Sequence, residues 1–285
     1  MAKTQDIRRR IRSIQNTRQL TKAMKMVSAA KLKRATAAVV AARPYAEHMH
    51  AMLVSIAGRA GADTHPLLEA RPERRVEVVV LTGDKGLCGS FNGNIVKAAL
   101  RFVESRRDAE VRAHVVGKRG RDSLRRLRIP MERERVDVSR RMDAGLAREI
   151  AADVLERFLD GRIDAAYLVY NRFRSAISHT VSIERLLPIE RPEAAADVPS
   201  EDYIYEPDAA TLFDRLLPRS VEIQLHRAIL ESVAAEHGAR MTAMDSATRN
   251  AGELIDGLTL HMNRVRQAAI TTEIIEVVSG AAALE

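Results

Sequence analysis

The sequence predicts an α/β protein in which two long helices at the chain ends flank a central domain of alternating strands and helices. All ten aromatic residues lie between Tyr45 and Phe213, and all nine prolines lie between Pro44 and Pro218. Proline interrupts helices and aromatic side chains fill cores, so the chain should divide into three regions. These are a helix over residues 1–57, a central domain over 58–218 and a second helix over 219–285.

The first region has the pattern of a helix that pairs with one other helix. Its apolar residues recur at spacings of three and four, and Lys, Arg, Gln and Ser occupy the other faces. A stripe this narrow is typical of a two-helix seam rather than of a globular core. We expect a break or kink at Pro44, which has no backbone N–H to donate. The stripe consists of Ile7, Ile11, Ile14, Met24 and Val27.

The last region contains no proline between Arg219 and Gly280. Its seam residues recur at a mean step near 3.5, the coiled-coil period. The two end helices should pair antiparallel, because one leads into the domain and the other leaves it. At about 1.5 Å per residue, the second helix should extend beyond the first. The expected seam is Met241, Met244, Ala247, Ala251, Leu254, Leu258, Met262, Val265, Ala269 and Thr272, with Gly238, Gly252 and Gly257 marking close contacts.

The central region alternates β-branched runs with helical stretches, which predicts a Rossmann-like α/β domain. The expected strands are Val76–Leu81, Val111–Val116, Ile163–Tyr170 and Ser178–Leu186. The expected helices are 94–105, a basic stretch after Gly117–Gly120, and 139–160, and an irregular connection should follow over 188–207.

Charge is distributed unevenly along the chain. Residues 1–43 carry twelve Lys and Arg against the one acid Asp6, a net +11, whereas 44–218 balance at zero and 219–285 carry −3. The basic helix could contact nucleic acid, face an acidic protein, or simply be solvated. The single cysteine excludes an intramolecular disulfide, and we expect neither a membrane span nor a secretory signal.

The glycine-rich segment Thr82–Asn92 (TGDKGLCGSFN) invites comparison with a phosphate-binding loop. A Walker loop needs its lysine after the last glycine, but Lys85 precedes Gly86 and Gly89. We therefore expect a structural or partner-contacting turn, with Cys88 as a packed residue. No pattern of residues predicts a catalytic group, a metal site or a bound cofactor.

Three segments resemble the γ subunit family of F-type ATP synthases. Residues 7–35 (IRRRIRSIQNTRQLTKAMKMVSAAKLKRA) are similar to its N-terminal signature, the loop TGDKGLCGSFN to its internal glycine-rich segment, and residues 236–284 to its C-terminal signature. The resemblance implies a non-catalytic rotor: an antiparallel coiled coil inside a hexamer of α and β subunits. The middle domain would lie near the membrane ring (the c-ring) with the ε subunit, and with δ as a further candidate partner.

The resemblance also implies a location and contact residues. The chain would be a peripheral protein on the cytoplasmic face of the bacterial inner membrane, one copy per complex, coupling proton-driven rotation to ATP synthesis and regulating ATPase activity and proton flow. Arg266 and Gln267 would contact β-subunit loops, with Lys22, Met24 and Lys25 on the facing helix. The alternatives are a coiled-coil scaffold or a nucleic-acid-binding protein that would bind RNA or DNA through residues 8–34, or an independent enzyme that uses the glycine-rich loop.

Overall fold

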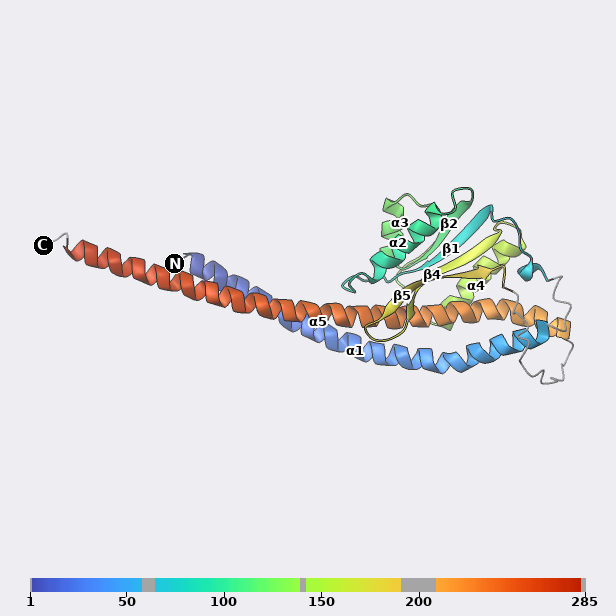
Figure 1. The fold of residues 1–285 in the computed structure, drawn as a ribbon, viewed down its shortest axis with the longest axis horizontal. Coiled ribbons are helices and arrows are strands. Elements are labelled where there is room, and N and C mark those ends of the chain that lie inside the picture. The colour runs from blue at the N-terminus through green and yellow to red at the C-terminus, as the bar shows by residue number, and fades with distance from the viewer. Residues whose placement is uncertain (1, 58–64, 139–141, 191–208, 283–285) are drawn as a thin grey trace. The chain divides into compact units, whose positions relative to one another are not determined.

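The computed structural model forms two compact units through which the same two helices pass (Figure 1). The first unit contains residues Met1–Ser28 and Arg240–Glu285, and the second contains Ala29–Ala239. Helices α1 (Ala2–Ala57) and α5 (Ala209–Ala282) contribute to both units. The structure describes residues 2–57, 65–138, 142–190 and 209–282. Most of the connection expected over 188–207 therefore lies outside the described residues.

The second unit is built on a five-stranded sheet with the order β3-β2-β1-β4-β5. The first four strands in this order are parallel, and β5 pairs antiparallel with β4. The bounds are β1 Arg75–Leu81, β2 Glu110–Val116, β3 Met131–Arg135, β4 Ala165–Phe173 and β5 His179–Leu187. The edge strand β3 was not predicted, because its sequence MERER has no apolar run. Charged side chains are common on edge strands, where they oppose pairing with other chains.

Helices cover both faces of this sheet (Figure 1). Alternate residues of β1 point to opposite faces: Val78 and Val80 pack with α2 and α3, whereas Val79 and Leu81 pack with α4 and α5. The helix bounds are α2 Phe91–Glu104, α3 Lys118–Arg126 and α4 Ala144–Leu159, and the short 3₁₀ turn η2 is Pro66–Leu68.

Two helix boundaries differ from the prediction. Helix α5 begins at Ala209 rather than at Arg219, and it runs through Pro218. The adjacent Leu217 and Val221 are almost completely buried in the core, and this packing outweighs the roughly 3 kcal/mol that an interior proline costs a helix. Helix α4 begins at Ala144 rather than at residue 139, because the Asp143 carboxylate accepts the backbone N–H of Leu146 at 3.1 Å and caps the first turn.

Helix α1 remains a single helix across Pro44, so the expected break does not occur. The buried residues Val39, Met49 and Leu53 on either side of the proline belong to the apolar face of the helix. Met49 and Leu53 pack into the same core as α5. Burial on both sides of Pro44 keeps the two segments helical although one backbone hydrogen bond is missing.

In the first unit, α1 and α5 form an antiparallel pair. The Lys25 ammonium lies 2.6 Å from the Asp245 carboxylate, and the hydroxyls of Thr21 and Thr248 lie 2.8 Å apart. The partner number rises as the α1 number falls, which is the signature of antiparallel helices. Helix α5 continues beyond the start of α1, and residues 271–279 are exposed on every face. The predicted overhang is confirmed.

The three helical glycines of α5 have different surroundings. A Cβ at Gly238 would lie 2.7 Å from the Ala176 carbonyl oxygen, one at Gly252 would lie 3.7 Å from the Arg18 guanidinium, and one at Gly257 would meet nothing within 4 Å. The close contact expected at Gly238 is therefore confirmed, whereas at Gly257 the described residues provide none.

This contrast predicts opposite effects of the same substitution. Gly257→Ala should stabilise the chain by up to about 1 kcal/mol, because alanine is the better helix former and its methyl group meets no neighbour. Gly238→Ala should destabilise it by about 1–3 kcal/mol, because the methyl group would force the Ala176 backbone away. Urea unfolding of the two variants, followed by circular dichroism, measures both effects. Equal effects at the two sites would contradict the packing described.

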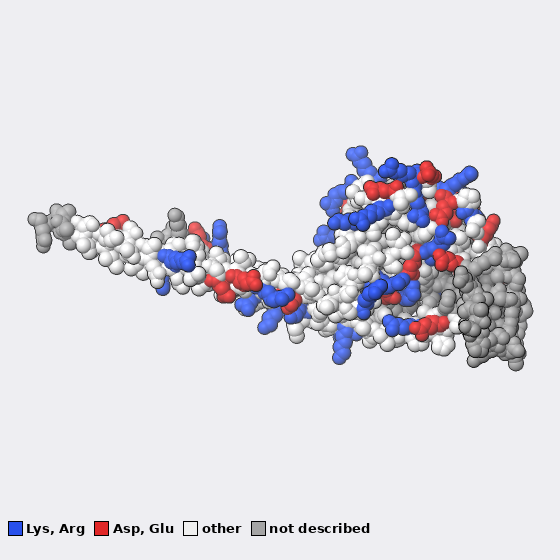
Figure 2. Space-filling model, viewed as in Figure 1, with Lys and Arg blue, Asp and Glu red and all other residues white. Residues whose placement is uncertain are grey.

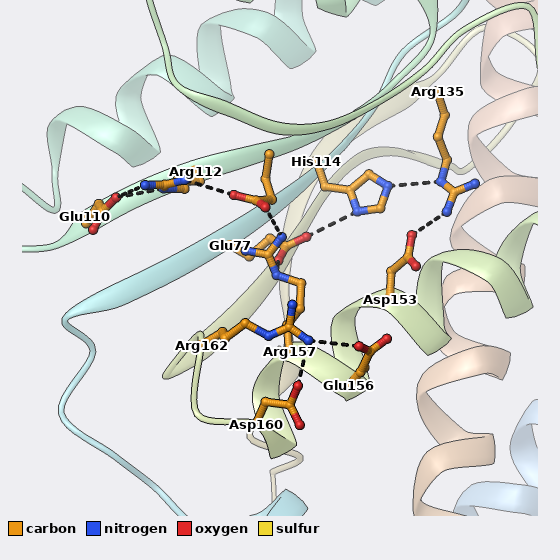
Figure 3. Close-up of polar contacts among 11 residues, drawn as sticks. Glu77, Glu110, Arg112, His114, Arg135, Asp153, Glu156, Arg157, Asp160 and Arg162 are labelled. Carbon is orange, nitrogen blue, oxygen red and sulfur yellow. Dashed lines mark hydrogen bonds and ion pairs between the residues drawn. The ribbon is translucent and has the colours of Figure 1, made fainter.

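A buried ion network attaches α4 to the sheet (Figure 3). Glu77 of β1 and His114 of β2 are both fully buried, and their side chains lie 3.2 Å apart. Arg157 of α4 places its Nε 3.2 Å from the Glu77 carboxylate without a well-aligned hydrogen bond, so charge attraction holds this pair. Arg157 also lies 2.6 Å from Glu132 of β3. One arginine thus balances carboxylates from two strands.

The same network determines which ring nitrogen of His114 carries the hydrogen that is donated to Glu77. Arg135 Nε, which can only donate, lies 3.2 Å from His114 Nε2 (Figure 3). His114 Nε2 must therefore accept, and its Nδ1–H donates to Glu77. Arg135 also pairs with Glu149 and Asp153 of α4. The network therefore links β1, β2, β3 and α4.

Candidate partner-binding surface of the two long helices

The last two turns of the α1 segment in the first unit present apolar side chains to solvent. Leu20, Met26 and Val27 are 61%, 65% and 56% exposed, whereas the neighbouring Thr21 and Ser28 are only 8% and 3% exposed. Val27 is therefore not a seam residue, as was predicted, although Ile7, Ile11, Ile14 and Met24 do lie toward the seam. The exposed apolar residues form an outward surface suited to contact with another protein.

The seam of α5 needs a matching correction. Leu254 is 57% exposed, and Ile255 occupies the half-buried position beside it. Thr272 lies in the overhang and is exposed. The prediction did not include the polar Thr248, whose hydroxyl contacts that of Thr21 across the seam. The other predicted seam residues are buried or half-buried: Met241, Met244, Ala247, Ala251, Leu258, Met262, Val265 and Ala269.

The overhanging end of α5 is apolar and exposed. Figure 2 shows few charges at this end of the first unit. Its large side chains are Ile270, Ile274, Ile275, Val277 and Val278, which are 48–72% exposed. An isolated helix with this much exposed apolar surface is unfavourable in water. The surface therefore fits enclosure by a protein partner.

The five predicted contact residues fall at two separate places. Lys22, Met24 and Lys25 lie on one stretch of α1 that faces Asp245 and Thr248, not Arg266. In the observed register, Arg266 and Gln267 lie opposite the first turn of α1. The two places are separated by about 20 residues, or roughly 30 Å at 1.5 Å per residue. Arg266, Gln267 and Lys22 are exposed, and Met24 is half-buried.

Lys25 has an internal partner as well as an exposed surface. Its side chain is 40% exposed, and its ammonium donates to Asp245. This hydrogen bond is the main reason that the pKa of Asp245 is lowered. A polar groove lies beside the pair, lined by Gln15, Asn16, Arg18, Gln19, Lys22 and Thr248. It presents cationic and amide donors to any partner that carries carboxylates or carbonyl groups.

The glycine-rich loop between β1 and α2 is held by its own side chains. Asn92 accepts the backbone N–H of Gly83 at 2.9 Å and donates to the Lys85 carbonyl at 3.2 Å. Cys88 is 2% exposed and packed, as predicted. Thr82 donates to the Val116 carbonyl at 2.8 Å and joins the loop to β2. Within the described residues, no three His, Cys, Asp or Glu side chains form a metal site.

In the second unit, one half-buried carboxylate joins the β4–β5 hairpin to α5. Glu184 accepts hydrogen bonds from Tyr170 of β4 at 2.7 Å and from Gln224 and Arg227 of α5 at 3.3 and 2.7 Å. Burial alone would raise its pKa, but these donors and Arg172 outweigh burial and lower it. One turn further along α5, burial raises the pKa of Glu231, whose carboxylate accepts the Phe173 backbone N–H at 3.3 Å.

The two carboxylates should therefore respond oppositely to neutralisation. The lowered pKa of Glu184 means that it adds stability at neutral pH, which is lost as the pH falls through its folded pKa. The raised pKa of Glu231 means that its charge opposes folding once the pH exceeds that pKa. Glu184→Gln should lower the urea midpoint at about pH 7.5, and Glu231→Gln should raise it. Both differences should shrink at about pH 4, and matching shifts in one direction would refute the assignment.

Comparison with known proteins identifies the family. A family model described as ATP synthase matches residues 3–284. The ATP synthase gamma chain of Solibacter usitatus is 51% identical, with 98% of each chain covered. The chain belongs to the ATP synthase γ chain family. The γ chain of an Anaeromyxobacter species is 49% identical over the full length of both chains.

Solved structures agree with this family assignment. A chain from a structure of the central stalk and c-ring of the Tetrahymena thermophila mitochondrial ATP synthase is 28% identical, with a TM-score of 0.62. The match covers 80% of this chain and 99% of that one. A chain from the Euglena gracilis mitochondrial ATP synthase, at 21% identity and a TM-score of 0.69, shows the same fold over 99% of this chain. Among the described residues of this γ family member, no helix is long and apolar enough to span a membrane.

Proposed function

We propose that this chain is the central-stalk rotor of an F-type ATP synthase. The observation that carries the proposal is the antiparallel helix pair whose longer member ends in an exposed apolar helix. Such a surface fits inside a ring of α and β subunits, where it would be enclosed without being fixed. The chain itself makes and breaks no bond. It couples two equilibria, because each orientation of an asymmetric shaft gives the three β subunits different contacts.

The second unit would receive the torque. Its sheet and α5 share one apolar core, to which Leu217, Val221 and Leu225 of α5 contribute with less than 2% exposure each. A force on the domain is therefore transmitted to α5 through close-packed side chains, which deform little. We infer that this domain contacts the c-ring and the ε subunit, with δ as a further candidate. The complex would place the chain peripherally on the cytoplasmic face of the bacterial inner membrane.

We also propose two sets of contacts with the β subunits. The two sets would contact the surrounding ring at different heights along the axis of the helix pair. The first set is Lys22, Met24 and Lys25, and the second is Arg266 and Gln267. The exposed cations at both places, and the net +11 of residues 1–43, would suit acidic partner loops. Exposed ion pairs contribute only about 0–1 kcal/mol each. Loss of any one of these charges should therefore leave the complex assembled.

The composition of the native complex tests the proposal. Purification through a tag on the second unit should recover two nucleotide-binding subunits, each in threefold excess over this chain. Recovery of nucleic acid without those subunits would instead support the scaffold alternative. ATP hydrolysis by the isolated chain that is lost in Lys85→Ala would support the enzyme alternative.

Truncation of α5 tests the role of the overhang. Removal of the residues from Gly280 onward should lower assembly only modestly, because the deleted side chains are small and each buries little apolar area. Removal from Ala268 onward should lower it more, since Ile270, Ile274 and Ile275 are lost together with the end of the seam. Gel filtration and ATPase activity of the reconstituted complex measure both. A short deletion as damaging as the long one would argue against an enclosed apolar end.

A further inference from the structure

The seam of the helix pair in the first unit becomes polar over one stretch. Successive seam positions on α1 follow steps of three and four residues: Ile7, Ile11, Ile14, Arg18, Thr21, Lys25 and Ser28. The first three are apolar and the last four are polar. The α5 residues opposite this stretch include Asp245, Thr248 and Gly252. We call the group Arg18, Thr21, Lys25, Ser28, Asp245 and Thr248 the polar seam layer.

The polar seam layer is only partly buried: the side chains of Lys25 and Asp245 are 40% and 37% exposed, and Arg18 is exposed. Thr21 and Ser28 are at most 8% exposed, although the apolar Leu20 and Val27 next to them are more than half exposed. A rotation of α1 by one residue would bury the apolar side chains and release the polar ones. That alternative would bury more apolar area, so the observed orientation depends on the bonds that Thr21 and Lys25 make across the seam. The Ser28 hydroxyl is satisfied within α1, where it donates to the Met24 carbonyl.

Those bonds are directional and specific to one register. Lys25 meets Asp245 at 2.6 Å, and the hydroxyls of Thr21 and Thr248 meet at 2.8 Å. A slip of α5 by one heptad would place Gly252 opposite Lys25 and Ile255 opposite Thr21. Both cross-helix bonds would then be lost together. An apolar seam has no equivalent discrimination, because burial of apolar surface is non-directional.

We propose that the polar seam layer locks the register of α1 against α5, so that the two helices turn as one body. Polar residues at seam positions of coiled coils specify register at the expense of stability. This inference rests on the proposed rotor function, since sliding between the helices would absorb torque before it reached the β subunits. Lys25, Asp245, Thr21 and Thr248 are thus positioning residues for energy coupling, and they act through the helix pair.

Charge reversal in the reconstituted complex tests this lock. Lys25→Asp places two carboxylates together, and Asp245→Lys places two ammonium groups together. Each should lower the number of protons pumped per ATP hydrolysed by about threefold, the scale of coupling between contacting residues. The double variant K25D/D245K restores opposite charges and should recover most of the wild-type ratio. Lys33→Asp makes the same charge change at an exposed residue of α1 that is not among the proposed β-subunit contacts, and it should leave the ratio unchanged.

The possible outcomes distinguish a failure of the register lock from a failure of the proposed rotor function. A double variant no better than either single one, or a Lys33→Asp variant as impaired as Lys25→Asp, would overturn the lock. The second result would also favour direct contact of these cations with a partner. A wild-type complex that pumps no protons when ATP is hydrolysed would instead contradict the rotor function itself. Thr21→Val with Thr248→Val removes the hydroxyl pair at nearly constant volume, and it should lower the same ratio without loss of assembly.

Discussion

Arg157→Met is expected to destabilise the chain by about 3–5 kcal/mol, because removal of one partner leaves a buried charge without compensation. Glu77 is fully buried, and of the residues described around it only Arg157 and His114 form ion pairs or hydrogen bonds with its carboxylate. Methionine has a similar length and is apolar, so the change removes charge with little change in volume. Urea unfolding of the isolated chain, followed by circular dichroism, measures the loss.

Two further variants show whether the loss of stability comes from the uncompensated charge of Glu77. Arg162→Met removes an exposed arginine that pairs with Glu156 and Asp160 next to the end of α4 (Figure 3), and it should have little effect. Glu77→Leu combined with Arg157→Met replaces the buried pair by apolar side chains and should recover much of the stability. If Arg157→Met were no worse than Arg162→Met, Glu77 would not depend on Arg157 for its charge balance.

Leu225→Ala should lower the free energy of unfolding by about 2–5 kcal/mol, the usual loss when a core leucine is truncated. Leu225 is completely buried where α5 packs against the sheet. Leu260 lies on the same helix but is 55% exposed, so Leu260→Ala should change the stability by no more than about 0.5 kcal/mol. The comparison uses one substitution on one helix, and equal losses would contradict the packing of α5 described above.

The core around Leu225 should affect the coupling of proton pumping to ATP hydrolysis as well as the stability of the chain. In a complex that contains Leu225→Ala, a loosened joint between α5 and the sheet should lower proton pumping more than ATP hydrolysis, because the β subunits carry out the chemistry. Proton pumping measured by fluorescence quenching in vesicles, alongside ATP turnover, distinguishes the two. Parallel losses of both activities would indicate a defect of assembly rather than of torque transmission.

The sequence predicted most elements of the central domain because their signals are local. The β-branched runs at β1 and β2 place each strand within one residue of its observed start. Strand β3 has no such signal, since its charged residues are held by Arg112, Arg125 and Arg157, which are distant in the sequence. The start of α5 was also missed, because tertiary packing around Pro218 overrides the local preference of proline.

The candidate binding surface was predicted only in part, for a related reason. Periodicity analysis assigns apolar residues to the seam, and on α1 it selected Val27 in place of the buried Ser28. On α5 it selected Leu254 in place of Ile255. The first error lies between the polar seam positions Lys25 and Ser28, and the second follows the polar seam position Thr248 within two turns. There, an ion pair and a hydrogen bond between distant residues help to determine which face is buried. The regular spacing of Ile7, Ile11 and Ile14, continued to Thr21 and Ser28, was the signal that could have revealed them.

Observation of rotation tests the rotor assignment most directly. The complex would be fixed to a glass surface through its nucleotide-binding subunits, and a bead would be attached to a cysteine introduced by Arg107→Cys, an exposed position in the second unit. The native Cys88 is buried and should not compete for the label. With ATP present, the bead should turn continuously in one direction. ATP hydrolysis at the normal rate with a stationary bead would contradict the account.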